Sequence, residues 1–151
     1  MLMKRTPLCG LIMAVILTSA SGARGESLGV TEGKLAPCPD SPNCVSTQSQ
    51  LKRHAMKPLP YLQTREASRQ RILGILKAIK RTTIVTATEF YIHAEFRTAL
   101  FRFVDDVEFF LDETARLVHF RSASRVGHYD FGTNRRRLEG ISKKYLEAVE
   151  N

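Results

Sequence analysis

The sequence predicts an α+β fold in which two helices pack on one face of a four-stranded antiparallel sheet, a meander, behind a disulfide-bonded N-terminal arm. Three observations support this prediction. Four consecutive stretches of β-type sequence lie between two amphipathic helical patterns, and two cysteines occupy a proline-rich segment that precedes them all. Consecutive strands with short connections pair with their neighbours and form an antiparallel sheet. Each amphipathic helix must bury its apolar stripe, and the simplest arrangement packs both helices on the apolar face of that sheet.

The first 25 residues have the pattern of a secretory signal peptide. Lys4 and Arg5 precede an apolar stretch, residues 8–20, which is too short to cross the roughly 30 Å of a bilayer's hydrocarbon core. Small residues follow, so we expect cleavage near Gly25, with Ala20-Ser21-Gly22 as the alternative site. The sequence therefore predicts a periplasmic protein without a transmembrane anchor after cleavage.

After cleavage we expect one globular unit with two parts: an irregular N-terminal arm, residues 26–63, and an α+β domain, residues 64–151. The formal net charge of +8 stays positive when the signal's cations are removed. Outside the cytoplasm, a basic balance favours anionic lipid head groups, phosphorylated sugars or an acidic protein surface as partners, and not nucleic acid. No cofactor motif is present.

Two cysteines, Cys38 and Cys44, remain after the signal with Cys9 is removed. Export favours a disulfide between them. A zinc site needs four ligands, and His54 is the only histidine nearby. Redox pairs usually have two intervening residues, whereas these cysteines have five. We favour a structural disulfide over a redox or metal role, because three prolines prevent this loop from forming a helix or a central strand.

The two helices are predicted from apolar residues at helical spacing. Ile72, Ile75, Leu76 and Ile79 lie on one face of a helix over residues 65–80, with Thr64 as its N-cap. A second stripe predicts the last helix over residues 133–149, and the Gly-Thr pair at 132–133 supplies its turn and cap. The members of this second stripe are Leu138, Ile141, Tyr145, Leu146 and Val149.

The four strands are predicted over residues 83–88, 90–98, 103–111 and 116–123. Their alternation puts an apolar set on the helix-covered face: Ile92, Ala94, Phe96, Val107, Phe109, Leu111, Val118 and Phe120. The opposite face would carry Tyr91, His93, Glu95, Arg97, Glu108, Phe110, Leu117, His119 and Arg121. That face is either a water-facing surface with cross-strand charge pairs, a ligand groove, or a metal site through His93 and His119.

The arginines at the start of the last helix are the most unusual feature. Arg135, Arg136 and Arg137 occupy its first turn, where the helix macrodipole is already positive. Either they pair internally with Asp105, Asp106, Asp130 or Glu139, or they form an anion site together with the helix start. For the second interpretation the predicted binding residues are Arg97, Arg121, Arg125, Asp130, Asn134, Arg135 and Arg137.

These patterns favour a non-catalytic binding or interaction module of the cell envelope, for an anionic ligand or an acidic partner. No nucleophile elbow is present, so we predict no catalytic residues. A hydrolase-like enzyme of the envelope, using His119, His128 or Asp130 as proton carriers, is the first alternative. A purely structural envelope protein, whose arginines and aspartates form an internal network, is the second.

Three segments, CPDSPNCVS, YIHAEFRTALFRFVDDVEF and RSASRVGHYDFGTNRRRLEGI, resemble the signature segments of a bacterial family, domain of unknown function 1499. The resemblance covers the chain from about Leu35 to the last helix and implies an exported or membrane-associated envelope domain without an established activity. The positions that match are Cys38, Cys44, Arg97, Phe101, Arg102, Asp105, Asp106, Glu108, Arg121, Ser122, Ser124, Arg125, Gly127, Asp130, Gly132, Asn134, Arg135 and Arg137.

Overall fold

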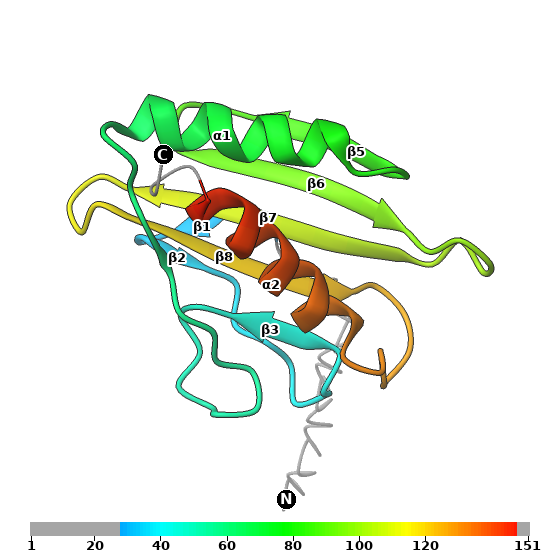
Figure 1. Ribbon diagram of the computed structural model, residues 1–151. Helices are drawn as coiled ribbons and strands as arrows, with labels where there is room; N and C mark the ends of the chain where they lie inside the picture. Colours follow the sequence, from blue (N-terminus) through cyan, green and yellow to red (C-terminus); the bar gives the residue numbers. More distant parts are fainter. Residues whose placement is uncertain (1–27, 148–151) are drawn as a thin grey trace, which may run out of the picture.

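The computed structural model describes residues 28–147 (Figure 1). The four predicted strands are present as β5 (Thr82–Ala87), β6 (Tyr91–Arg97), β7 (Val104–Asp112) and β8 (Leu117–Ser124). Each pairs with its sequence neighbour in antiparallel fashion. The predicted meander is therefore confirmed.

The prediction of four strands was wrong, because the main sheet has six. The two additional strands, β3 (Cys44–Ser46) and β4 (Leu59–Pro60), come from the arm, and both pair with β8. Without them β8 would be a bare edge with unpaired backbone groups, which sheets normally cover. Short strands next to prolines and a disulfide lack the alternation by which longer strands are recognised in a sequence.

Both helices, α1 (Arg65–Ala78) and α2 (Thr133–Leu146), lie on the same face of the sheet, as predicted (Figure 1). Thr64 begins α1 by accepting a hydrogen bond from the backbone N–H of Ala67 at 3.0 Å. Between helices and sheet lies the core, which contains every member of the predicted apolar set on the sheet together with Ile72, Ile75, Leu76, Leu138, Ile141 and Tyr145.

The opposite sheet face is partly covered. The hairpin of β1 (Val30–Thr31) and β2 (Lys34–Leu35) lies behind the sheet in Figure 1 and contacts β7 and β8. Beneath it, Glu108 and Arg121 are completely buried. The expectation of a water-facing surface was therefore wrong for the middle of this face, because the arm returns across it.

The predicted signal peptide, residues 1–25, lies outside the described residues, as does the predicted end of the last helix at Val149. Among the helices of residues 28–147, none is long and apolar enough to span a bilayer.

Candidate functional site

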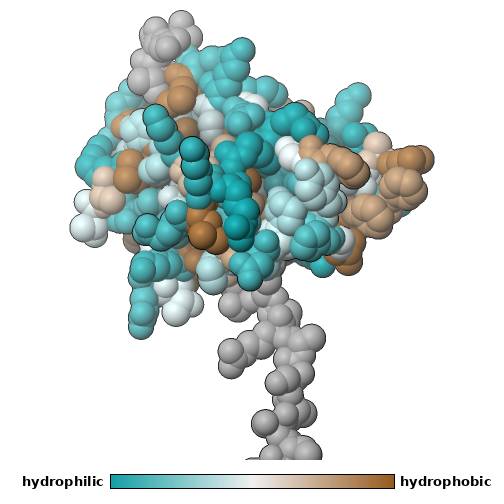
Figure 2. Space-filling view, turned by 90° about the horizontal axis from the view of Figure 1, so that it is seen from below, coloured by the Kyte–Doolittle hydropathy of each residue, from teal (hydrophilic) through white to brown (hydrophobic). Residues whose placement is uncertain are grey.

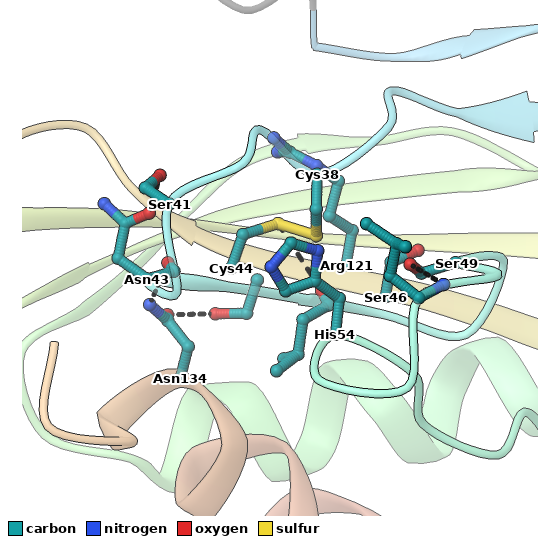
Figure 3. Close-up of a disulfide and its surroundings, with 12 residues drawn as sticks. Cys38, Ser41, Asn43, Cys44, Ser46, Ser49, His54, Arg121 and Asn134 are labelled. Carbon is teal, nitrogen blue, oxygen red and sulfur yellow. Dashed lines mark hydrogen bonds between the residues drawn. A yellow bond between two sulfur atoms is a disulfide. The ribbon is translucent and has the colours of Figure 1, made fainter. Parts of the chain in front are cut away.

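The disulfide between Cys38 and Cys44 is confirmed, and it holds a loop against the end of β8 (Figure 3). Asn43, next to Cys44, is buried and bonds in two directions. Its side-chain Nδ2 donates to the carbonyl of Gly127 at 2.6 Å, and its own carbonyl accepts from Asn134 Nδ2 at 2.8 Å. The disulfide loop therefore positions both the segment after β8 and the start of α2.

Arg121, a predicted binding residue, lies in a buried ion pair. Its Nη1 is 3.2 Å from Oε2 of Glu108, directly opposite on β7, and neither side chain is exposed. Glu108 Oε1 also accepts from the Tyr91 hydroxyl and from the backbone N–H of Gly29, each at 2.7 Å. Burial, together with this carboxylate, raises the pKa of Tyr91. The pair is a structural element under the arm and is not accessible to a ligand.

Arg97 and Arg125, two further predicted binding residues, lie at the ends of β6 and β8 and both contact Glu95. Arg125 contacts Asp106 Oδ2 through Nε at 2.7 Å and Glu95 through Nη2 at 2.5 Å, and Arg97 contacts Glu95 at 3.0 Å. His93 Nε2 is 2.7 Å from the other Asp106 oxygen. Burial alone would raise the pKa of Asp106, but the hydrogen bonds from Arg125 and His93 outweigh it and lower that pKa to about 2.

The start of α2 is already supplied with acceptors from within the protein. Asp130 accepts from the backbone N–H of Gly132 at 2.9 Å and of Asn134 at 2.8 Å, so its carboxylate occupies the position where an external anion would bind. Arg137 contacts Asp105 at 2.5 Å and Asn134 Oδ1 at 2.6 Å. The internal pairing considered for these arginines is therefore present for Arg137.

Arg135 points away from this group and donates to the carbonyls of Arg53 at 2.9 Å and Ala55 at 3.1 Å, which join α2 to the arm. The seven predicted binding residues are therefore distributed over both faces of the sheet, and they do not form one site. Arg97 and Arg137 line a groove on the helix side of the sheet, whereas Asp130 lines a different hollow. Ligand binding by the set stays a prediction.

The proton carriers of the hydrolase alternative are not brought together. His119 pairs with Phe110 near the far end of β7, where its Nδ1 is 3.2 Å from Thr47 Oγ1, and burial lowers its pKa despite the nearby Asp112. His128 and Asp130 follow β8 at the other end of the sheet. Within the described part of the chain, no group of three or more His, Cys, Asp or Glu residues is arranged to hold a metal ion.

Sequence reasoning missed a cluster of apolar side chains on two loops. Loop 98–103 joins β6 to β7, and loop 125–132 joins β8 to α2; together we call them the loop end. Six of the eleven exposed large hydrophobic residues in the described chain lie here: Leu100, Phe101, Phe103, Val126, Tyr129 and Phe131. Figure 2 shows brown side chains gathered on the side of the molecule where loop 98–103 projects in Figure 1.

The aromatic side chains of the loop end are ordered against one another. Phe101 and Phe103 stack with ring centroids 5.5 Å apart, and Tyr129 meets Phe131 edge-on at 5.2 Å. Between the loops lies a cleft of about 470 Å³ with mostly apolar walls. The signal available in the sequence was four aromatic residues in segments that also contain Gly127, Asp130 and Gly132, which are turn formers.

Arginines lie beside these apolar side chains. Arg81, Arg97 and Arg102 line a small pocket on the outer side of loop 98–103. Arg97 pairs with Glu95, whereas Arg81 and Arg102 have no carboxylate within ion-pair distance among residues 28–147. The loop end therefore combines exposed apolar groups with cations that the described chain leaves unpaired.

Backbone strain is concentrated at the same place. Of the five non-glycine residues with positive φ in the described chain, two lie in these loops, Arg102 at 55° and Phe131 at 53°, and a third, Arg81 at 61°, lines the adjoining pocket. Such conformations cost on the order of 1–3 kcal/mol for a residue with a side chain and occur most often at functional sites. Glycine would adopt these conformations with less strain. The presence of two arginines and a phenylalanine at these positions therefore needs an explanation.

Comparison with known proteins gives a family without a described activity. The chain matches the family model "Protein of unknown function (DUF1499)" over residues 34–145. Neither a curated protein nor a solved structure matches it. The matched segment contains every element from β2 to the last turn of α2, so the chain belongs to this family, as its three signature segments predicted.

Proposed function

We propose that this member of the DUF1499 family is a non-catalytic binding module of the cell envelope that docks on the surface of an anionic lipid bilayer through its loop end. One observation carries the proposal: six large apolar side chains are exposed on two neighbouring loops, beside arginines that have no carboxylate partner among residues 28–147. The positive formal charge of the chain favours the same kind of partner.

The composition of the loop end favours a lipid surface over a soluble partner. Aromatic and aliphatic side chains that enter the head-group region, flanked by cations that attract anionic lipids, are the features of proteins that bind at a membrane interface. Leu100, Phe101 and Phe131 are the most exposed, at 79%, 69% and 79%. Full burial of such a side chain contributes roughly 1.5–3 kcal/mol, and each basic residue near an anionic surface adds about 1 kcal/mol.

The internal contacts of loop 125–132 support this use. Asn43 holds the carbonyl of Gly127, and Asp130 accepts from two backbone N–H groups at the start of α2. The loop is thus fixed in place while its apolar side chains point outward. A preorganised loop loses little conformational entropy on docking, which favours binding.

Export to the periplasm is part of this proposal. The disulfide is compatible with an oxidising compartment, and the predicted signal peptide would deliver the protein there. In that compartment the anionic surface would be the outer leaflet of the inner membrane or the inner leaflet of the outer membrane. An acidic protein surface remains the alternative occupant, and the experiment below distinguishes the two.

The test is co-sedimentation of the mature protein with vesicles. One set contains phosphatidylglycerol and phosphatidylcholine in equal amounts, and the other contains phosphatidylcholine alone. We expect binding to the first set and much weaker binding to the second, with a strong decrease as salt rises from 50 to 500 mM. The double variant Phe101→Ser, Phe131→Ser should weaken binding at least tenfold, because it removes two inserted rings.

The matched control is the double variant Leu51→Ser, Val85→Ser, which changes two exposed apolar residues away from the loop end, at 46% and 51% exposure. It should bind vesicles as the unmodified protein does. Docking on lipid is refuted if the unmodified protein stays in the supernatant with anionic vesicles at 50 mM salt, or if both double variants lose binding equally. Retention on an acidic protein together with absence of vesicle binding would favour the alternative occupant.

A further inference from the structure

A second hollow lies beside the loop end, on the helix side of the sheet. It is a groove of about 520 Å³ between the residues that follow α1, the end of β6 and one side of α2 from Thr133 to Lys144. It shares Thr98 and Thr133 with the cleft between the two loops, so the two hollows are adjacent. Its charged lining residues are all cations: Lys80, Arg81, Arg97, Arg136, Arg137 and Lys144.

We propose that this groove is a binding site for a compact, multiply charged phosphate group, such as a phosphomonoester or a pyrophosphate. The inference goes beyond docking on a bilayer, because a soluble phosphate would satisfy the same side chains as a lipid head group. Phosphate is the chemical class in question, and the experiment below separates its two sources.

The charge balance of the groove carries the inference. Arg137 is paired with Asp105 and Arg97 with Glu95. Lys80, Arg81, Arg136 and Lys144 have no ion pair with any carboxylate of residues 28–147. Cations that converge on one hollow repel one another, so a bound anion relieves an unfavourable interaction as well as forming new hydrogen bonds.

The kind of anion follows from the shape and lining of the groove. Ile79, Phe96 and Ile141 make part of its lining apolar. We therefore expect the negative charge of a ligand to lie only next to the cationic side chains. Two guanidinium groups match the oxygens of a phosphate in the paired, planar manner for which arginine is suited. A phosphomonoester brings nearly two charges within one small group, whereas the carboxylates of an acidic peptide carry one each and lie farther apart.

Arg81 provides an independent indication. It lies in the turn after α1, immediately before β5, and has a φ of 61°, a conformation in which glycine is favoured. Its side chain is exposed and has no ion pair in the described chain, so no internal contact explains why an arginine stands there. A role in binding would explain both the residue type and the strain.

The experiment is isothermal titration calorimetry of the mature protein with pyrophosphate at 50 mM salt. A second arm uses a short-chain phosphatidic acid below its micelle concentration. We expect one ligand per protein in at least the pyrophosphate arm. The double variant Arg81→Gln, Arg136→Gln should weaken this binding at least tenfold, because both exposed side chains line the groove and, within the described chain, Arg136 is held only by a carbonyl and a hydroxyl, those of Phe131 and Thr133.

Two control variants make the result specific. Lys52→Gln, Lys57→Gln removes the same charge from exposed positions of the arm and should bind pyrophosphate as the unmodified protein does. Phe101→Ser, Phe131→Ser should also retain pyrophosphate binding, although it loses vesicles. Tighter binding of phosphatidic acid than of pyrophosphate would support a lipid head group as the natural source, and equal binding would support the phosphate group alone.

The groove site is overturned if the unmodified protein binds neither soluble phosphate, or if all variants bind pyrophosphate with equal affinity. Binding to anionic vesicles without binding to either soluble phosphate would overturn the groove site and leave docking intact. Binding to pyrophosphate without binding to vesicles would have the reverse meaning, so the two proposals fail separately.

Discussion

Two regions of this protein use arginine in opposite ways. In the ion-pair networks of the sheet, Arg121, Arg125 and Arg137 each contact a carboxylate on β7. At the loop end and beside it, Arg102 and Arg81 have strained backbone conformations and pair with no carboxylate among the described residues. Net charge alone therefore does not distinguish the two regions; the presence or absence of carboxylate partners among the described residues does.

The contrast also explains why the arginines at the start of α2 are compatible with the helix macrodipole. Asp130 places negative charge at the helix N-terminus, and Arg137 reaches across to Asp105 on β7. These contacts offset the unfavourable field that Arg135, Arg136 and Arg137 experience in the first turn. Arg136, in the same turn, has no carboxylate partner among the described residues, and its Nη1 donates to the carbonyl of Phe131 at 2.7 Å.

The largest expected effect concerns the buried pair. Arg121→Met should lower the free energy of unfolding by about 3–5 kcal/mol, because it leaves Glu108 buried without its cation. Adding Glu108→Gln should recover part of the loss, since a neutral amide can still accept from Tyr91 and Gly29. Urea unfolding measures both variants.

The control for this variant is Arg53→Met, which breaks the ion pair with Asp40 on the surface. Exposed pairs contribute little to stability, so its urea midpoint should match that of the unmodified protein. If Arg121→Met is no more destabilising than Arg53→Met, the buried pair does not stabilise the fold more than an exposed one, and this prediction is wrong.

A smaller effect is expected from pH. The folded pKa of Asp106, about 2, lies below its ordinary value of 3.8. The network therefore contributes its full stabilisation above pH 4, and this is lost as the pH falls toward 2. The shift corresponds to roughly 2 kcal/mol. Urea unfolding between pH 5 and 2.5 should show this loss, and Asp106→Asn should show a correspondingly shallower dependence.

Asp40→Asn is the matched control, since the Asp40 side chain is fully exposed. Its stability should depend on pH as that of the unmodified protein does. The other carboxylates contribute equally to all three proteins, so the difference in slope isolates Asp106. Parallel curves for the unmodified protein and Asp106→Asn would contradict the assignment of this carboxylate to the network.

The sequence was sufficient to predict most of the fold for a simple reason. Strands β6 to β8 alternate in polarity over seven or more residues, and the helices carry apolar stripes, so their faces follow from periodicity. Cross-strand charge pairs were one of the arrangements considered for the opposite face, and Glu108 with Arg121 is such a pair. Strands β3 and β4, with three and two residues, are too short to show a period.

The candidate site was less predictable, because it depends on register and on loops. Which arginine meets which carboxylate is decided by the β7–β8 pairing, in which Asp106 faces Ala123 and lies beside Arg125. Loops show no periodic pattern of apolar residues. The sequence therefore could not predict that Phe101 and Phe131 line the same cleft. The useful signal was local: aromatic residues in segments whose glycines and aspartates indicate turns.

The smallest expected effect is a gain in stability at the loop end. Arg102 has a φ of 55° and an exposed side chain without an ion pair in the described chain. Arg102→Gly should raise the free energy of unfolding by up to about 1 kcal/mol, because relief of the left-handed strain exceeds the entropic cost of glycine. The same variant should bind anionic vesicles more weakly, since it removes a cation beside the apolar loops.

Arg116 provides the matched comparison, with the same φ of 55° in the turn between β7 and β8. Its Nη2 donates to the carbonyl of Gln63 at 3.0 Å, and its guanidinium lies 5.7 Å from the centre of the Tyr61 ring. Arg116→Gly therefore loses contacts as well as strain and should show no gain in urea unfolding. Equal losses of stability in both variants would mean that Arg102, like Arg116, stabilises the fold through internal contacts. The distinction between paired and unpaired arginines would then be wrong for Arg102, on which the proposed function depends.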